Sequence, residues 1–498
     1  MSDSTLSSSD QLSSPDQFSA IASDTRADSR ANISSEIGSE APMLAVKHQI
    51  AKGGQLLFLN LAHFLDHFFM LIFSTVAAFR LSQEWGMSYA ELVPYATPGF
   101  ITFGVCSLAA GWLADKWGRE KMMLIFFLGI GFSGIAAGFT ISPLQIALAL
   151  TLVGIFASIY HPVGIAMLVQ GRSKPGMVLA INGVYGNLGV ACAALITGVL
   201  IDYLGWRSAF ILPGIIALLL GVAYGTLLYR SQRSDVGQER EQGCGQASDQ
   251  PVKESLVIQA VDKERVNQKV VDEKRADEKP ADKKQVSVKK ENQEIDQHQP
   301  GGLSKQTLIQ AFAVIFTTCA MGSVLFQSST FALPKIFDER LTDLVASETS
   351  ATSVGWYAFA VFSLAALAQL LVGYLVDRYS ARKVFMGVAL LQALSFTLLT
   401  QATGLEALLW CALAMFAVFG QIPINDVLIS RISQSEWRSR IYAVKNTLAF
   451  SVMAITLPLI GWIHGQWGFQ LLFTLLAGTA FISVLALIFM PKAVAHSH

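Results

Sequence analysis

The chain has 498 residues, of which 52% are hydrophobic and only 14% are charged. Soluble proteins carry about 25% charged residues, so this composition excludes a soluble protein of this size and indicates apolar surface that faces lipid. The formal net charge is zero, so no basic field favours a nucleic-acid partner.

Polar segments flank and divide the apolar sequence. Residues 1–50 are rich in Ser and Asp and lack the basic and apolar regions of a signal peptide, so a disordered cytoplasmic tail is expected. Lys, Arg, Asp and Glu alternate in residues 231–304, which predicts a charged cytoplasmic linker; a docking site for a soluble partner is the alternative. Residues 492–498 are expected to form a short cytoplasmic tail.

The remaining sequence consists of apolar runs, each long enough for a helix that crosses about 30 Å of hydrocarbon. Helices satisfy their own backbone groups in lipid, and no strand-like alternation suggests a barrel. The sequence therefore predicts an all-α integral membrane protein with twelve transmembrane helices in two six-helix bundles, at residues 51–230 and 305–491. The expected spans are 55–79, 91–114, 121–140, 144–169, 176–200, 206–229, 306–333, 352–376, 384–402, 405–428, 441–463 and 469–490.

Lys and Arg are distributed unequally between the two sets of short loops. Twelve lie in one set, and only Arg80, Arg207, Lys335 and Arg340 lie in the other. Because cytoplasmic loops carry the excess of Lys and Arg, the first set is predicted to face the cytoplasm, together with both termini and the linker. A bacterial inner membrane is the expected location.

The two halves of the chain repeat a motif. Gly111-x-Leu-x-Asp115-Lys116 recurs as Gly373-x-Leu-x-Asp377-Arg378. Parallel repeats of this kind place a solute site between the halves, near the middle of the bilayer.

The first copy of the motif continues through Gly118, Arg119 and Lys121. It resembles the signature loop between helices two and three of the major facilitator superfamily. The resemblance implies a transporter with the twelve-helix major facilitator fold. The second copy departs from the first, because Ser380 and Ala381 stand at the positions of Gly118 and Arg119.

The signature loop is expected to act as a cytoplasmic gate. Gly111 allows two helices to approach closely, and Asp115 at a helix N-terminus has Arg119 and Lys121 as expected partners. A second ion pair is expected between Asp426 and Arg431; the alternative for the loop is a topological turn without a gating role. The predicted gate comprises Gly111, Asp115, Lys116, Gly118, Arg119, Lys121, Gly373, Asp377, Arg378, Arg382, Asp426 and Arg431.

Three further patterns carry a finer resemblance. They are His63-x-x-Asp66 in helix one, Tyr160-His161-Pro162 in helix four and Gly186-Asn187-x-Gly189 in helix five. These patterns resemble the fosmidomycin-resistance-like branch, which implies proton-linked drug export. Many antiporters have a Gly-Pro pair late in helix five, whereas this chain has Ala193-Ala194 there.

Ionisable side chains inside the membrane cost at least about 2.5–3.5 kcal/mol each, so each one calls for a function. His63, Asp66 and His67 share one helical face. Asp66 and His161 are expected at depths of about 16 and 12 Å from the membrane surface, at about 1.5 Å per residue. A carboxylate beside an imidazole can load and release a proton near neutral pH, so all four residues are proton-coupling candidates. A fixed hydrogen bond between helices is the alternative.

Other polar side chains in the apolar runs are candidates for the solute cavity, with helix–helix hydrogen bonding as the alternative. They are Tyr160, Asn182, Asn187, Gln327, Gln421 and Asn425.

The chain has no P-loop and no GxSxG, HExxH or paired-cysteine motif. It is therefore predicted not to be an enzyme and to bind no metal or cofactor, with the proton as coupling ion. We expect a monomeric secondary transporter of a small organic solute that works by alternating access, with proton-coupled efflux by antiport favoured. Proton-coupled uptake by symport is the first alternative. A non-transporting sensor or scaffold that acts through the linker is the second.

Overall fold

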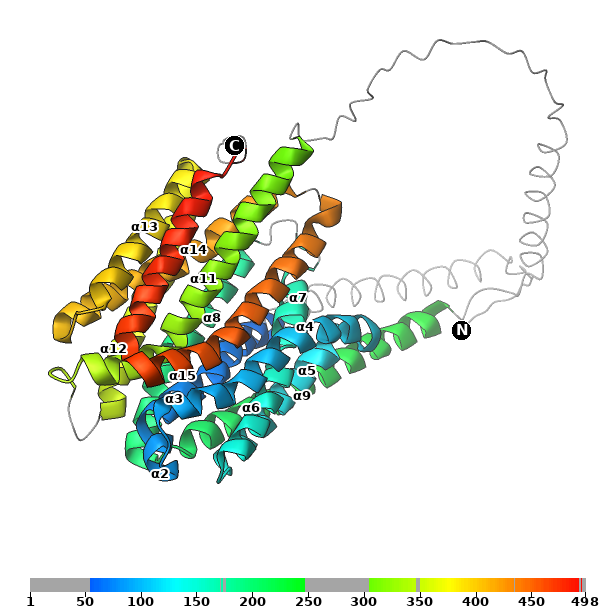
Figure 1. The fold of residues 1–498 in the computed structure, drawn as a ribbon. Helices are drawn as coiled ribbons and strands as arrows, with labels where there is room; N and C mark the ends of the chain where they lie inside the picture. Colours follow the sequence, from blue (N-terminus) through cyan, green and yellow to red (C-terminus); the bar gives the residue numbers. More distant parts are fainter. Residues whose placement is uncertain are drawn as a thin grey trace, which may run out of the picture.

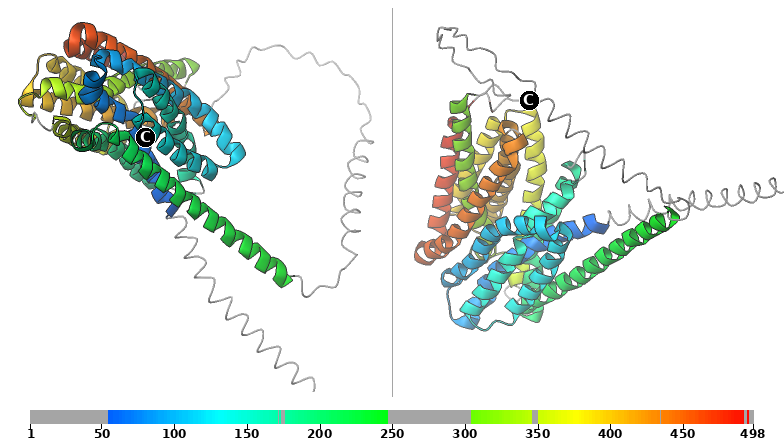
Figure 2. Two further views of the ribbon diagram at one scale, coloured as in Figure 1. Left: turned by 90° about the horizontal axis from the view of Figure 1, so that it is seen from below. Right: turned by 90° about the vertical axis from the view of Figure 1, so that its right-hand side faces the viewer.

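The computed structural model describes residues 54–170, 172, 176–246, 304–345, 350–433, 435–491 and 494. The described residues form helices and short turns, and no strand occurs among them (Figure 1). The predicted N-terminal tail, the linker beyond residue 246 and nearly all of the short C-terminal tail lie outside the described residues. Residues 231–246, the first part of the predicted linker, continue helix α9 away from the bundle (Figure 2).

The N-terminal bundle has six helical spans. Two are interrupted by π-helical turns, η1 (Ala77–Leu81) and η3 (Tyr160–Gly164). The spans are Gly54–Trp85, which ends in η1 and α2 (Ser82–Trp85); Tyr89–Trp117, made of α3 (Tyr89–Leu92), η2 (Val93–Ala96) and α4 (Thr97–Trp117); α5 (Arg119–Gly138); Pro143–Val169, made of α6 (Pro143–Ala157), η3 and α7 (Ile165–Val169); α8 (Gly176–Leu204); and Ser208–Arg230 of α9 (Ser208–Gln246).

The C-terminal bundle also has six helical spans. Its helices are α11 (Lys305–Arg340), α12 (Ser350–Arg378), α13 (Ala381–Leu399), α14 (Gly404–Ile432) and α15 (Ser435–Ile488). Helix α15 contains two spans, because Gly468 has φ 67° and ψ −169° and breaks the helix between them. Eleven continuous segments therefore provide twelve spans, and the predicted all-α fold is confirmed.

The repeated motif adopts different turns in the two halves. Gly118 joins α4 to α5 with φ 93°, a conformation that only glycine adopts without strain. Ser380 joins α12 to α13 with φ −54°, which any residue tolerates. The weaker second copy of the motif thus has a geometric reason, since its turn does not need glycine.

The two bundles meet along α8 and α12 and along α4 and α15 (Figure 1). We call the end with the turns at residues 118 and 380 the motif end, and the end with the turn at residue 205 the far end. Close contacts between the bundles gather at the far end. A Cβ on Gly198 would lie 2.2 Å from the Ala351 carbonyl oxygen, and one on Gly355 would lie 2.7 Å from Leu195 Cα. Small residues thus bring two helix backbones together, as is usual where membrane helices cross.

Two hydrogen bonds join the bundles along α8 and α12. Beside this crossing, the Thr352 backbone N–H donates to Asp202 Oδ2 (2.7 Å). Nearer the middle of the two helices, Asn187 Nδ2 donates to Gln369 Oε1 (3.1 Å). Arg80 also lies 4.0 Å from the Asp202 carboxylate. The far end is therefore closed in this conformation.

Candidate functional site

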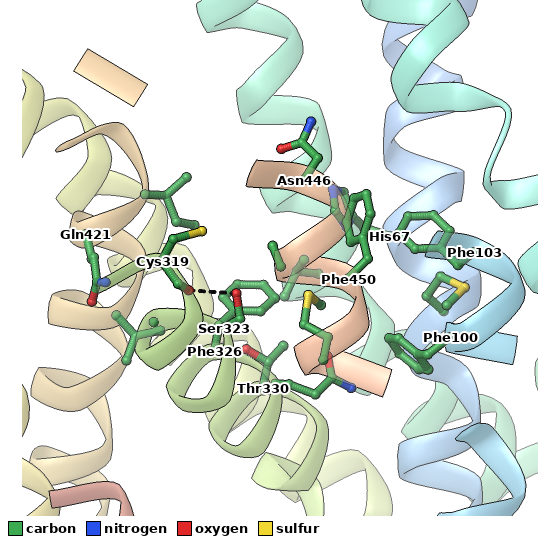
Figure 3. Close-up of a pocket in the computed structure, with 18 of the residues that line it drawn as sticks. His67, Phe100, Phe103, Cys319, Ser323, Phe326, Thr330, Gln421, Asn446 and Phe450 are labelled. Carbon is green, nitrogen blue, oxygen red and sulfur yellow. Dashed lines mark hydrogen bonds between the residues drawn. The ribbon is translucent and has the colours of Figure 1, made fainter. Parts of the chain in front are cut away.

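A cavity of about 230 Å³ lies between the two bundles. Aromatic rings from both halves form much of its wall (Figure 3). Its polar lining comes chiefly from His67 and His161 of the N-terminal bundle and from amide side chains of the C-terminal bundle. The lining residues are His67, Met70, Leu71, Phe100, Phe103, His161, Val190, Cys319, Gly322, Ser323, Phe326, Gln327, Thr330, Val418, Gln421, Ile422, Asn425, Lys445, Asn446, Ala449, Phe450 and Met453.

The structure brings the four proton-coupling candidates together beside this cavity. His161 Nε2 lies 3.3 Å from Asp66 Oδ2, and His67 Nε2 lies 3.2 Å from His63 Nε2. Asp66 is fully buried, whereas the His161 side chain is 25% exposed. Only His67 and His161 of the four reach the cavity wall, so a proton passing between Asp66 and the cavity has His161 as its nearest relay.

Local helix geometry places His161 at this point. His161 lies in the π-helical turn η3, one residue before Pro162. Proline has no backbone N–H and cannot continue the regular helical hydrogen-bonding pattern, which favours a local irregularity. Such π-turns are frequent at functional sites because they reorient one side chain.

A hydrogen bond to the backbone fixes the orientation of His63. Its Nδ1 lies 2.8 Å from the Asn182 carbonyl oxygen, which can only accept, so Nδ1 carries the hydrogen. In the neutral ring, Nε2 is then the acceptor and faces His67 Nε2. The two imidazoles form a hydrogen-bonded chain that ends at the cavity wall.

The predicted cavity residues Tyr160 and Asn182 do not line the cavity. Tyr160 is fully buried, and its hydroxyl donates to Asn182 Oδ1 at 2.8 Å. Asn182 Nδ2 in turn donates to Asn60 Oδ1 at 3.0 Å. These side chains therefore hold the first span, the fourth span and α8 together behind the histidines. Asn187 also lies outside the lining, since it bonds Gln369 across the bundles.

The other predicted amides, Gln327, Gln421 and Asn425, lie on the cavity wall. Gln421 is held at both ends: its Nε2 donates to the Thr318 carbonyl at 2.8 Å, and its Oε1 accepts from Gln392 Nε2 at 2.9 Å. Gln392, which is fully buried, was not among the sequence candidates. A lone glutamine in an apolar run gives no signal that it supports a neighbour on another helix.

The predicted ion pair between Asp426 and Arg431 is wrong. Asp426 Oδ1 accepts from Lys445 Nζ at 2.6 Å, and Arg431 donates to the Val376 carbonyl at 3.2 Å. Residues five apart on a helix point in different directions, whereas residues three or four apart face each other. Lys445 lies on the cavity wall. Its positive charge is compensated there by the Asp426 carboxylate.

The signature loop forms contacts within the N-terminal bundle. Arg119 lies 3.9 Å from the Asp115 carboxylate and donates to Gln170 Oε1 at 3.2 Å. Asp115 lies in the last turn of α4 rather than at the start of α5, and its side chain is 76% exposed. A Cβ on Gly111 would lie 3.6 Å from Pro162, which is ordinary contact, so the expected close helix approach is modest here.

The remaining predicted gate residues lie at the motif end. Lys116 lies over the Trp112 ring at 3.8 Å and Arg378 over the Tyr374 ring at 4.4 Å. Arg382 donates to the Ile488 carbonyl at 2.8 Å. Lys121 and Asp377 are exposed, and a Cβ on Gly373 would meet nothing within 4 Å. The gating role of this set stays a prediction.

The histidine cluster is also the place among the described residues where a metal ion could be held. The ring nitrogens of His63, His67 and His161 can all lie within 4.8 Å of one another. The expectation that the chain binds no metal stays a prediction.

Comparison with known proteins identifies the family of the chain. The family model for the Major Facilitator Superfamily matches residues 59–346 and 308–498. The fold resembles that of a D-xylose-proton symporter, with a TM-score of 0.60 and 14% sequence identity over 89% of this chain and 99% of that one. It also resembles a peptide transporter, POT, with a TM-score of 0.62 and 15% identity over 89% of this chain and 95% of that one.

Similar sequences include transporters of small organic compounds. A gallate transporter of Pseudomonas putida is 28% identical over 31% of this chain and 34% of its own length, so the alignment spans about a third of that relative. The puromycin resistance protein pur8 of Streptomyces alboniger is 30% identical over 29% of each chain. A 4-hydroxybenzoate transporter, PcaK, of Acinetobacter baylyi is 22% identical over 84% of this chain and 86% of its own. The chain is an integral, multi-pass membrane protein that belongs to the Major Facilitator Superfamily.

Proposed function

We propose that this transporter moves a small, largely apolar aromatic solute by alternating access and couples the movement to protons at Asp66 and His161. The observation that carries the proposal is the position of this pair beside the central cavity, with Asp66 buried and His161 on the cavity wall. The cavity and the proton-carrying pair therefore share a wall, so protonation and solute binding influence each other.

Burial makes the pair suited to this task. An ionised carboxylate without contact to water needs a partner or a proton. His161 is the ionisable group that lies 3.3 Å away, so the pair can share one bound proton or hold none, as a carboxylate beside a neutral imidazole. Uptake of the proton changes the pair from one negative charge to neutral, and this difference lets one proton change the affinity for the solute.

The lining of the cavity favours an apolar aromatic solute. Phe100, Phe103, Phe326 and Phe450 offer ring faces and edges, while Gln327, Gln421 and Asn425 offer hydrogen bonds to a few polar atoms. The relatives are named a gallate transporter, a 4-hydroxybenzoate transporter and a puromycin resistance protein. All three compounds contain an aromatic ring, which supports an aromatic solute.

We favour export by antiport. The cationic Lys445 on the wall is paired with Asp426, so the cavity is less suited to anionic aromatic acids, whose transporters are the relatives that favour the alternative of uptake. The resemblance of His63, Asp66 and His161 to the fosmidomycin-resistance-like exporters supports the same direction. Uptake by symport is the second candidate, favoured by the resemblance to transporters of aromatic acids. A scaffold that acts through the linker requires neither the cavity nor the buried pair.

The proposal includes a location and a topology. The chain lies in a bacterial inner membrane as a monomer, with the motif end, both termini and the linker in the cytoplasm. The excess of Lys and Arg at the motif end supports this orientation. In this orientation the conformation described above is closed towards the outside, since the close contacts between the bundles lie at the far end.

Transport in proteoliposomes tests the proposal. Radiolabelled gallate, 4-hydroxybenzoate and puromycin are offered with and without an imposed pH gradient, and fosmidomycin, which has no aromatic ring, is the comparison. Antiport predicts that protons and solute move in opposite directions, and symport predicts the same direction. Deletion of residues 247–303 should leave the flux intact. A chain without pH-driven flux of any of the three aromatic compounds would contradict the proposed coupling and solute class together.

A further inference from the structure

A second cavity, of about 380 Å³, lies between α4 and α15. Its walls are one face of each helix, since the lining residues follow helical spacing on both. They are Thr97, Ile101, Gly104, Val105 and Leu108 of α4 and Thr447, Phe450, Ser451, Ala454, Ile455 and Pro458 of α15. No charged side chain belongs to this lining, so the crevice suits an uncharged, lipophilic molecule.

The outer rim of the crevice faces away from the protein. Ile101, Val105, Leu108 and Ile455 are 48%, 65%, 58% and 62% exposed. All four belong to membrane-spanning helices, so their exposed apolar surface contacts lipid rather than water. The crevice therefore opens sideways into the bilayer.

The inner wall of the crevice is shared with the central cavity. Phe450 lines both cavities. On the side of the central cavity its ring meets Phe103 edge-on, with ring centroids 5.0 Å apart, and lies 6.2 Å from the His161 ring. On α4, Gly104 leaves room for this ring, because a Cβ there would lie 2.9 Å from Phe450 Cβ. Phe450 thus lies between the crevice and the histidine cluster, packed against Phe103.

We propose that the crevice is a lateral port through which a small lipophilic solute passes from the bilayer into the central cavity, with Phe450 as the movable partition. This rests on the proposed transport of an apolar solute and adds its route. The occupant is the solute rather than a whole phospholipid, because the cavity behind Phe450, at about 230 Å³, is too small for a two-chain lipid. Rotation of the Phe450 ring, which both cavities share, is the movement that would join them.

Photolabelling of the protein in proteoliposomes tests the port. The probe is an uncharged aryl diazirine, a small aromatic compound that dissolves in the bilayer and forms a carbene on illumination. Labelled residues are mapped by mass spectrometry. Phe326 reports on the central cavity, since it lines that cavity and not the crevice. Leu475, which is 46% exposed on α15, reports on the lipid surface.

The expected result is labelling at both residues in the unaltered protein. Val105→Trp fills the rim of the crevice and should abolish the labelling of Phe326 while that of Leu475 remains. Val222→Trp is the matched control, because Val222 is 59% exposed on another lipid-facing helix, and it should change neither. Phe450→Ala removes the partition and should increase the labelling of Phe326.

Two results would overturn the port. In the first, Val105→Trp and Val222→Trp have the same effect on the labelling of Phe326. The probe would then reach the central cavity through water and not through the crevice. The other is labelling of Leu475 without labelling of Phe326 in both the unaltered protein and Phe450→Ala. The experiment needs neither a solute nor a pH gradient, so absent flux with intact port labelling refutes only the proposed function.

Discussion

His161 Nε2 lies 3.3 Å from Asp66 Oδ2, yet only the imidazole lines the central cavity. The carboxylate has no exposed surface, so its nearest route to water runs through the imidazole. The two residues come from different helices, the first span and the turn η3. A change at either residue therefore tests a different step of the same proton transfer.

Asp66→Asn should abolish transport driven by a pH gradient and leave solute exchange. The amide keeps the size and hydrogen-bonding capacity of the carboxyl group but cannot take up a proton. A tenfold loss of coupling corresponds to about 1.4 kcal/mol. Counterflow and pH-driven flux are measured in the same proteoliposomes. Full pH-driven transport in the variant would show that the proton site lies elsewhere. Loss of both activities would show that Asp66 is a structural residue or contacts the solute.

His161→Gln should slow the proton step without removing the site. Glutamine can still donate a hydrogen bond to the Asp66 carboxylate but cannot pass a proton on. We expect a changed pH profile of transport with solute affinity changed by less than about tenfold, or less than about 1.4 kcal/mol. His67→Gln is the comparison, because His67 also lines the cavity but contacts His63. Equal effects of the two variants would contradict a direct relay through His161.

Lys445 should show energetic coupling to Asp426, whereas Arg431 should show none. Lys445 Nζ lies 2.6 Å from Asp426 Oδ1, and the Lys445 side chain is only 15% exposed. Lys445→Met should lower the stability by about 1.5–3 kcal/mol, the usual range for a hydrogen bond to a charged group. The double variant with Asp426→Asn should lose less than the sum of the two single changes. Thermal unfolding in detergent measures the cycle, and a larger coupling of Asp426 to Arg431 would contradict the pairing.

Gln392→Leu should weaken solute binding although Gln392 does not line the cavity. It removes the donor to Gln421 Oε1, so the Gln421 amide is held only through its Nε2 bond to the Thr318 carbonyl. A buried acceptor left without a partner costs about 1–3 kcal/mol. Gln392→Met is the comparison, since it keeps the size of the side chain but has no donor, and it should have the same effect. The apparent affinity in transport should fall while the maximal rate changes little; unchanged affinity would contradict the positioning role.

Cysteine labelling checks the proposed orientation. Ser88→Cys, in a chain without its native cysteines, should react with a membrane-impermeant thiol reagent in intact cells. Lys121→Cys, at the motif end, should react only after the cells are opened. The opposite pattern would reverse the orientation and place the closed far end in the cytoplasm.

The helices were predictable because each membrane span requires a run of about 20 apolar residues. The break at Gly468 followed from the gap between two apolar runs, although the helical segment continues across it. Asp66 and His161 were recognisable because charge is costly in lipid. The role of Gln392 was not, because its partner lies on another helix and only tertiary packing brings them together. The pairing of Asp426 with Lys445 was missed for the same reason.

The crossing at Gly198 and Gly355 has a consequence for the energy of opening the outer side. The carbonyl groups of Ala351 and Ala194 that face these glycines belong to helices, so they keep their own hydrogen bonds when the backbones part. Separation at this seam therefore leaves no orphaned polar group. The bond of Asp202 to Thr352 must still break, at about 0.5–3 kcal/mol. A free-energy cost of this size is small enough for one proton-dependent change in the cavity to tip the balance between the two conformations.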